Sequence, residues 1–135
     1  MERRQLPIIG TDEFGLSEQD VIAAIKQSTE NVNGHREGLD DPDEKMREVS
    51  RRFLPKAEAE LSALTTGSPS DVLGKARTFY DRTIELTTQG LKGEILARQL
   101  GEDFPDLMNF YGLLRTRTWG YHLGQTVTAA KVFRR

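Results

Sequence analysis

The feature that most constrains the fold is a long apolar stripe with a helical period between residues 46 and 64. Its side chains recur every three or four residues, and they are Met46, Val49, Phe53, Ala57, Leu61 and Leu64. This spacing places them on one face of an α-helix. Pro55 lies inside the stripe, where proline removes one helical hydrogen bond. Because the period continues across it, we predict one kinked helix rather than two unrelated ones.

Local start signals predict the first two helices. Ser17 is a good N-cap, and Asp20 three residues later completes a capping box. We expect this first helix to end before Gly34, with residues 34–41 as a loop. In the sequence DPDE at residues 41–44, we expect Asp41 to cap the helix that carries the stripe.

A third start signal, SPSD at residues 68–71, precedes another helical stripe that includes Tyr80. We predict a helix to about residue 88, and a second helix or a bent continuation from there to Leu100, with Gly101 as its end. Asp103 is then expected to cap a further helix.

The last segment, residues 112–135, fits two kinds of structure. Small residues recur every four positions, which gives one smooth helical face; they are Gly112, Thr116, Gly120, Gly124 and Thr128. The sequences RTRTW and QTVTA instead alternate with the period of a strand. We favour a helix, because the preceding helix has no clear stop signal before Gly112, and a β-hairpin stays open as the alternative.

These patterns predict an all-α protein of four to six helices in a bundle-like arrangement. Residues 1–16 form an extended N-terminal arm, in which Pro7 and Gly10 interrupt a short apolar piece. Residues 17–111 form the helical domain. Residues 112–135 form a basic C-terminal segment that packs with this domain or with a partner.

Composition limits the chemistry that the chain can perform. Its 135 residues fit one domain, and the absence of cysteine excludes disulfides and thiolate chemistry. No apolar run approaches the roughly 18 residues of a membrane span, and no segment resembles a signal peptide. We therefore expect a cytoplasmic protein, or a virion protein if the chain is viral.

Charge is unevenly distributed along the chain. The net charge is −2, but residues 11–60 carry 13 acidic and 7 basic residues, whereas residues 112–135 carry five basic residues and no acidic one. This asymmetry indicates surfaces of different sign.

No catalytic or metal-binding motif is present in the sequence. His35 and His122 have no potential ligand or base at helical spacing. We interpret the acidic residues 40–44 as a helix cap rather than a calcium loop. The carboxylate pairs Glu58 with Glu60 and Glu102 with Asp103 are expected to be solvated or capping groups. We predict that the protein is not an enzyme and has no cofactor and no metal.

The leading hypothesis is a non-enzymatic assembly or adaptor subunit of a larger complex, for example a virus particle, acting through its two ends as a homo-oligomer or with another protein. The residues expected at protein contacts are Leu6, Ile8, Ile9, Gly112, Trp119, Gly120, Tyr121 and Gly124. The alternative is nucleic-acid binding by cations and aromatic rings of the tail, with contacts at Arg115, Arg117, Trp119, His122, Lys131, Arg134 and Arg135. A third hypothesis is a small-molecule site near Trp119, Tyr121 and His122.

Overall fold

The computed structural model describes residues 13–133, and every regular element in this range is a helix. The helices are α1 (Glu18–Gly38), α2 (Glu44–Leu64), α3 (Pro69–Thr88), α4 (Gly93–Asp103), the 3-10 turn η1 (Leu107–Phe110), α5 (Tyr111–Leu114) and α6 (Thr118–Phe133). The all-α prediction is confirmed. The β-hairpin alternative for the tail is wrong, because Thr118 to Phe133 form a helix.

Capping chemistry explains where α1 and α3 begin. The Asp20 carboxylate accepts the backbone N–H of Ser17 at 2.8 Å, and the Asp20 N–H is held by the Ser17 hydroxyl in return. Ser68 and Asp71 form the same capping box at the start of α3. These two predicted starts are confirmed, because a capping box uses only residues within one turn of each other.

The start of α2 lies two residues later than predicted. Asp43, not Asp41, caps the helix, and its carboxylate accepts the backbone N–H of Lys45 at 3.0 Å. Asp41 instead accepts the N–H of Asp43 at 2.8 Å and shapes the preceding turn. From Asp43, α2 continues through Pro55 as one helix.

Several predicted helix ends are wrong for a tertiary reason. Gly34 lies inside α1, which continues to Gly38 because α1 packs along α2. Gly101 lies inside α4, whose last residue is Asp103, so Asp103 does not begin a new helix. By contrast, α3 ends at Thr88 as predicted, where Gly90 takes a φ of 95° that favours glycine.

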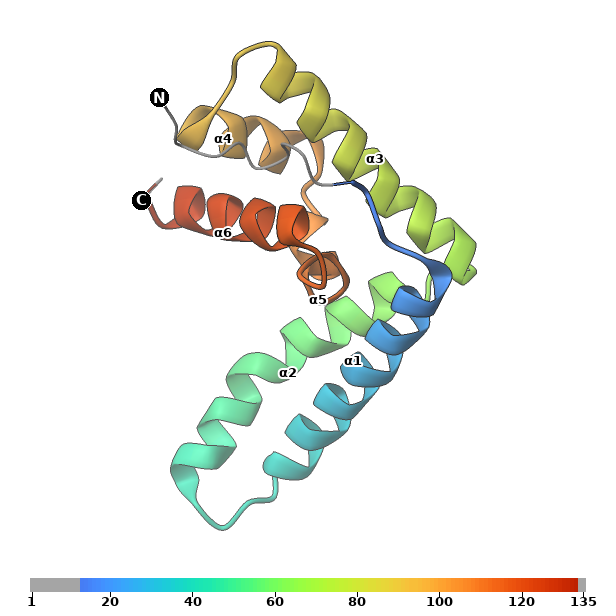
Figure 1. The fold of residues 1–135 in the computed structure, drawn as a ribbon. Coiled ribbons are helices and arrows are strands. Elements are labelled where there is room, and N and C mark those ends of the chain that lie inside the picture. Colours follow the sequence, from blue (N-terminus) through green and yellow to red (C-terminus); the bar gives the residue numbers. More distant parts are fainter. Residues whose placement is uncertain (1–12, 134–135) are drawn as a thin grey trace.

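Helices α1 and α2 form a hairpin that projects away from α3, α4 and α6, so that the molecule has two arms joined near α5 (Figure 1). Only the base of the hairpin enters the hydrophobic core, through Val21 and Ala24 of α1 and Leu64 of α2. Further out, Val32 is buried between the two helices, and Gly38 leaves room for the Ser50 side chain. The distal hairpin is therefore two helices without a core of their own.

The core contains two groups of aromatic rings. Phe14 stacks on Trp119 with ring centroids 5.8 Å apart, and Tyr80 meets Trp119 edge-on at 4.9 Å. Phe79 makes edge contacts with Phe104 at 4.9 Å and with a third ring, Phe110, at 5.4 Å. These rings join the segment before α1, helix α3 and the C-terminal elements.

Candidate functional site

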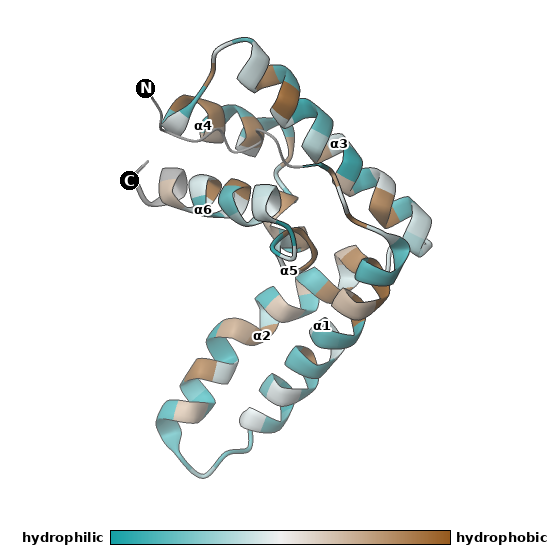
Figure 2. Cartoon of the chain, in the orientation of Figure 1, coloured by the Kyte–Doolittle hydropathy of each residue, from teal (hydrophilic) through white to brown (hydrophobic). Residues whose placement is uncertain are grey.

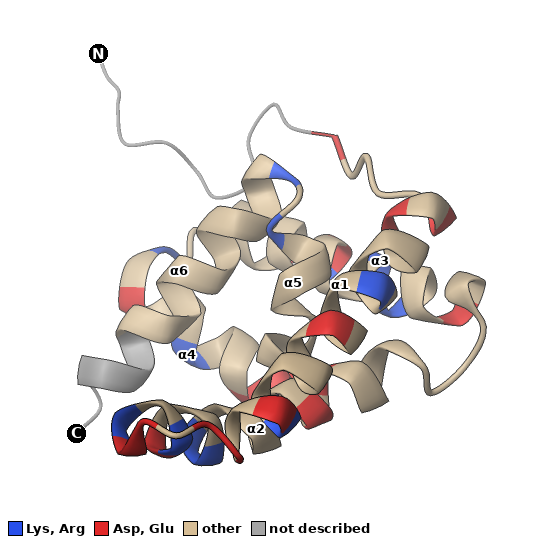
Figure 3. Ribbon diagram, turned by 90° about the horizontal axis from the view of Figure 1, so that it is seen from below, with Lys and Arg blue, Asp and Glu red and all other residues tan. Residues whose placement is uncertain are grey.

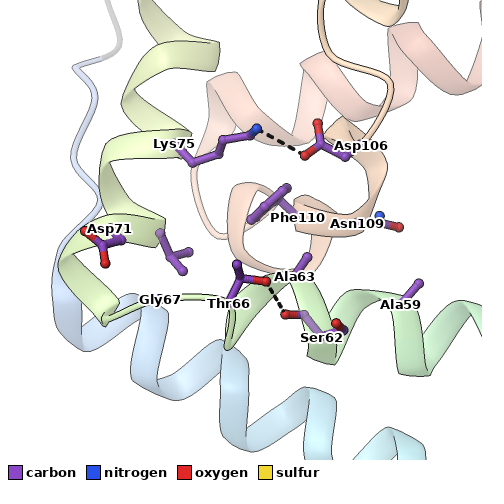
Figure 4. A pocket seen from close by; sticks show the side chains of 11 residues that line it. Ala59, Ser62, Ala63, Thr66, Gly67, Asp71, Lys75, Asp106, Asn109 and Phe110 are labelled. Atoms are coloured by element: carbon purple, nitrogen blue, oxygen red, sulfur yellow. Dashed lines mark hydrogen bonds and ion pairs between the residues drawn. The ribbon is translucent and has the colours of Figure 1, made fainter.

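One hollow of the surface lies between the end of α2, the start of α3 and η1 (Figure 4). It has a volume of about 610 Å³. Lys75 and Asp106 face each other across it, with Nζ and Oδ2 3.1 Å apart. The Asp71 carboxylate is held by the capping box of α3. The Lys75–Asp106 pair joins α3 to the start of η1, and Asp71 caps α3, so these charged groups have structural roles around the hollow.

A second groove of about 810 Å³ runs between the hairpin and the segment from η1 to α6. Glu60 lies in it, half-buried, and accepts the backbone N–H of Gly112 at 2.8 Å. Burial raises the pKa of the Glu60 carboxyl, although the Gly112 N–H and the positive charge of Arg115 act in the opposite direction. The Ser28 hydroxyl also lines this groove and has no hydrogen-bond partner among the described residues. The groove thus combines a half-buried carboxylate that bonds the α5 backbone with a hydroxyl that bonds no base among the described residues.

The remaining carboxylates singled out from the sequence have structural partners or lie in solvent. Glu58 pairs with Arg36 of α1, with Nη2 and Oε2 3.2 Å apart. Asp103 pairs with Arg82 at 2.8 Å, which lowers the pKa of the Asp103 carboxyl, and this pair ties α4 to α3. Arg82 therefore reaches a partner outside its own helix.

The tail residues predicted to contact a protein partner are largely used inside the chain. Trp119 is fully buried, and its Nε1 donates to the carbonyl oxygen of Phe14 at 2.8 Å. A Cβ at Gly120 would overlap the Leu114 carbonyl oxygen, and one at Gly124 would overlap the Tyr111 ring. The predicted smooth face is not continuous, because the chain turns at residues 115–117 between α5 and α6. Its glycines Gly120 and Gly124 instead let α6 approach α5 closely.

Other predicted contact residues have different surroundings. A Cβ at Gly112 would overlap the Glu60 carboxylate, so this glycine serves the joint between α5 and α2. Tyr121 is exposed, with 47% of its surface accessible, and its ring meets His122 edge-on at 5.6 Å. The arm residues Leu6, Ile8 and Ile9 lie outside the described residues.

The predicted nucleic-acid contacts are only partly brought together. Arg115 and Arg117 are exposed where the chain turns from α5 into α6, and His122 is exposed on α6. Trp119 is not available for stacking on a base, because its ring is enclosed. The side chain of Lys131 and all of Arg134 and Arg135 lie outside what the structure describes.

The most unusual surface is one that the sequence predicts as core. Met46, Val49 and Phe53, here called the distal stripe, keep 48%, 41% and 39% of their surfaces exposed on α2. Figure 2 shows these apolar turns as brown segments along the otherwise hydrophilic hairpin. Lys56 and Arg52 lie over the Phe53 ring, at 5.4 Å and 5.9 Å from its centroid. An apolar row of this kind is typical of a contact surface.

The sequence places the distal stripe on the same helical face as Leu61 and Leu64, because all of these residues share one helical period. The period does not show at which residue the other helices stop covering this face of α2. One signal is present in the sequence: the stretch KMREVSRRF surrounds the three apolar residues with charges on nearly every other position. Leu64, by contrast, follows an uncharged run, LSA, and is fully buried.

Within residues 13–133, no three side chains of the metal-binding types gather into a site. None of the helices in this range combines the length and the apolar character that a membrane span requires. Comparison of the chain with protein-family models, with curated proteins and with solved structures finds no match.

Proposed function

We propose that this protein is a non-enzymatic helical assembly or adaptor subunit that acts through protein–protein contacts of its α1–α2 hairpin. The observation that carries the proposal is the exposed distal stripe on a hairpin that has no core beyond its base. Because 39–48% of each side chain is still exposed, a partner that covers the row would gain roughly half of the about 1.5–3 kcal/mol that complete burial of such a side chain contributes. A partner that covers the row would stabilise the hairpin and gain binding energy at once.

The proposal moves the main contact surface from the two ends of the chain to the hairpin. Phe14 and Trp119, near the two ends, bind each other instead of a partner. The hairpin is also the most projecting element of the described chain (Figure 1), which makes it accessible to a large partner. When a partner packs on the hairpin, the two together would complete a bundle-like arrangement of helices.

The groups that line the two hollows also support a non-enzymatic role. Lys75 and Asp106 join α3 to the start of η1, Asp71 caps α3, and Glu60 holds the backbone of α5. A catalytic acid or base must reach a substrate within hydrogen-bond distance. These carboxylates are instead directed at groups of the chain itself.

Site-specific photocrosslinking tests the proposal. A photoreactive phenylalanine analogue at Val49 should form protein adducts in an extract of the producing cells. The matched control is Ile84 on α3, which is 37% exposed but isolated from the distal stripe. If position 49 gives no more protein adducts than position 84, the hairpin is not a protein-contact surface.

A nucleic-acid-binding subunit is the alternative, and one observation favours it. Arg115 and Arg117 are both exposed at one corner of the chain, and no acidic residue follows them in sequence. Binding through phosphates should weaken steeply as salt increases. A gel shift at low salt that is lost in Arg115→Ala and Arg117→Ala, with Arg98→Ala of α4 as control, would favour this alternative over the hairpin.

A further inference from the structure

The distal stripe forms one wall of a groove of about 450 Å³ between the outer parts of α1 and α2. Met46 and Val49 line it from α2, and Glu30, His35 and Glu37 line it from α1. The ring of His35 stacks on that of Phe53, with centroids 6.2 Å apart. This contact fixes which residues of α1 and α2 lie at the same level along the hairpin.

Several charged side chains of the hairpin that lie away from the distal stripe form ion pairs. Glu58 lies about 140° round the helix from Phe53, and it binds Arg36 at 3.2 Å. Arg51, about 160° from Phe53, binds Glu48 at 2.7 Å. Away from the distal stripe, ion pairs therefore link Arg36 of α1 to α2 and run along α2 itself.

Charged side chains that border the distal stripe are unpaired. Lys45, Arg52 and Lys56, here the basic edge, flank it on the side away from α1, because Ser50 faces Gly38 of α1 on its other side. Glu30 and Glu37, here the acidic edge, border the groove from α1. Among the described residues, neither edge forms an ion pair, although Figure 3 shows charges of both signs gathered along the hairpin.

From this arrangement we infer that the distal stripe binds a second copy of the same chain. The inference rests on the proposed function and names the partner. The surface is apolar in the middle, basic on one side and acidic on the other, so it is complementary to itself about a two-fold axis that runs along the stripe. A four-helix bundle then forms, with the two α2 helices at its centre.

The charged edges select the orientation of the two copies. With the two-fold axis along the distal stripe, the α2 helices lie parallel, and each basic edge lies over the acidic edge of the second copy. With the axis across the stripe, the helices lie antiparallel, and each basic edge lies over another basic edge, where like charges repel. The parallel arrangement is therefore favoured.

The His35–Phe53 contact also predicts which charges meet. Arg52 lies one residue nearer the hairpin tip than Phe53, and Glu37 lies two residues nearer the tip than His35. Their heights along the hairpin therefore differ by about 1.5 Å. Lys56 and Glu30 are displaced the other way, and their levels differ by about 3 Å. Two copies thus place Arg52 opposite Glu37 and Lys56 opposite Glu30.

Sedimentation velocity on the full-length chain tests the inference. For an interface of this small size we expect a dimer with a Kd of about 10 µM. Val49→Asp should weaken association at least about 10-fold, with the helical circular dichroism unchanged because the side chain is exposed. Ile95→Asp on α4 is the control, since Ile95 is 68% exposed and outside the distal stripe; it should leave the dimer intact.

Charge reversal and cysteine crosslinking test the orientation. Arg52→Glu should weaken the dimer, and addition of Glu37→Lys to the same chain should restore it. Because the chain has no cysteine, Met46→Cys introduces a single thiol. In the parallel dimer it lies against its own counterpart and should form a disulfide-linked dimer on mild oxidation, whereas in the antiparallel one it would lie near Phe53.

The results separate this inference from the proposed function. A wild-type chain that stays monomeric at about 200 µM, well above the expected Kd, overturns self-association, as does a dimer that Val49→Asp leaves unchanged. If such a monomer still forms adducts with a different protein from position 49, the proposed function stands and only the second copy is wrong. A dimer in which Met46→Cys fails to crosslink and Glu37→Lys gives no rescue overturns the parallel arrangement.

Discussion

The indole Nε1 of Trp119 donates a 2.8 Å hydrogen bond to the carbonyl oxygen of Phe14, a residue 105 positions earlier in the chain. The two rings also stack, with centroids 5.8 Å apart. This pair closes the fold, because it fixes the segment before α1 to the start of α6. The only tryptophan of the chain is thus a structural anchor.

Trp119→Phe should destabilise the protein by about 2–3 kcal/mol, because it leaves the Phe14 carbonyl oxygen without its donor and leaves a cavity. Thermal unfolding followed by circular dichroism measures the loss. Tyr121→Phe is the matched control, since Tyr121 is exposed next to the same turn. Equal unfolding temperatures for the two variants would contradict the anchoring role.

Gly120→Ala should destabilise the fold by about 2 kcal/mol or more, because the new Cβ would overlap the Leu114 carbonyl oxygen, which is backbone and cannot move aside easily. Gly74→Ala on α3 has nothing within 4 Å of the new Cβ. It should stabilise the protein by about 0.5–1 kcal/mol through helix propensity. Urea unfolding of both variants checks these opposite signs.

Glu60→Gln should stabilise the protein at neutral pH by about 0.5 kcal/mol, because the amide oxygen still accepts the Gly112 N–H while the cost of a half-buried charge disappears. The pKa of Glu60 is raised in the fold, so ionisation costs wild-type stability above that raised value. The advantage of the variant should therefore shrink as pH falls through the raised pKa toward the ordinary value of 4.5, and should be absent below it.

Urea unfolding between pH 3 and pH 8 measures the difference in stability between Glu60→Gln and the wild-type protein. Glu58→Gln serves as the control, because this exposed carboxylate makes only a surface ion pair and should change stability by less than about 0.5 kcal/mol. A Glu60→Gln variant that is less stable at pH 7 than at pH 4, relative to wild type, would show that the carboxylate charge stabilises the joint instead.

How much the sequence predicts depends on how local each determinant is. The starts at Ser17 and Ser68 follow from capping boxes that close within one turn. The helix ends near Gly34 and Gly101 do not, since a glycine ends a helix only where the rest of the fold allows it. The pattern of RTRTW could not decide between helix and strand, and its first three residues in fact form the turn before α6, whose start is fixed by the buried Trp119.

The same reasoning applies to the candidate site. The period of α2 predicts which residues share a face, and Met46, Val49 and Phe53 do share one. Whether that face is covered depends on α1, which packs on the neighbouring side through Ser50. The pairing of Glu60 with the Gly112 backbone, 52 residues away, has no local signature at all.

The central claim is that the outer hairpin is stabilised by contacts on the distal stripe, and amide hydrogen exchange of α2 as a function of protein concentration tests it most directly. In dilute solution, residues 44–57 should exchange faster than those of α3, because few buried contacts hold them. Raising the concentration above the expected Kd of about 10 µM should slow exchange in this range only, and Val49→Asp should remove the effect. Exchange of residues 44–57 that matches α3 at every concentration would contradict the account.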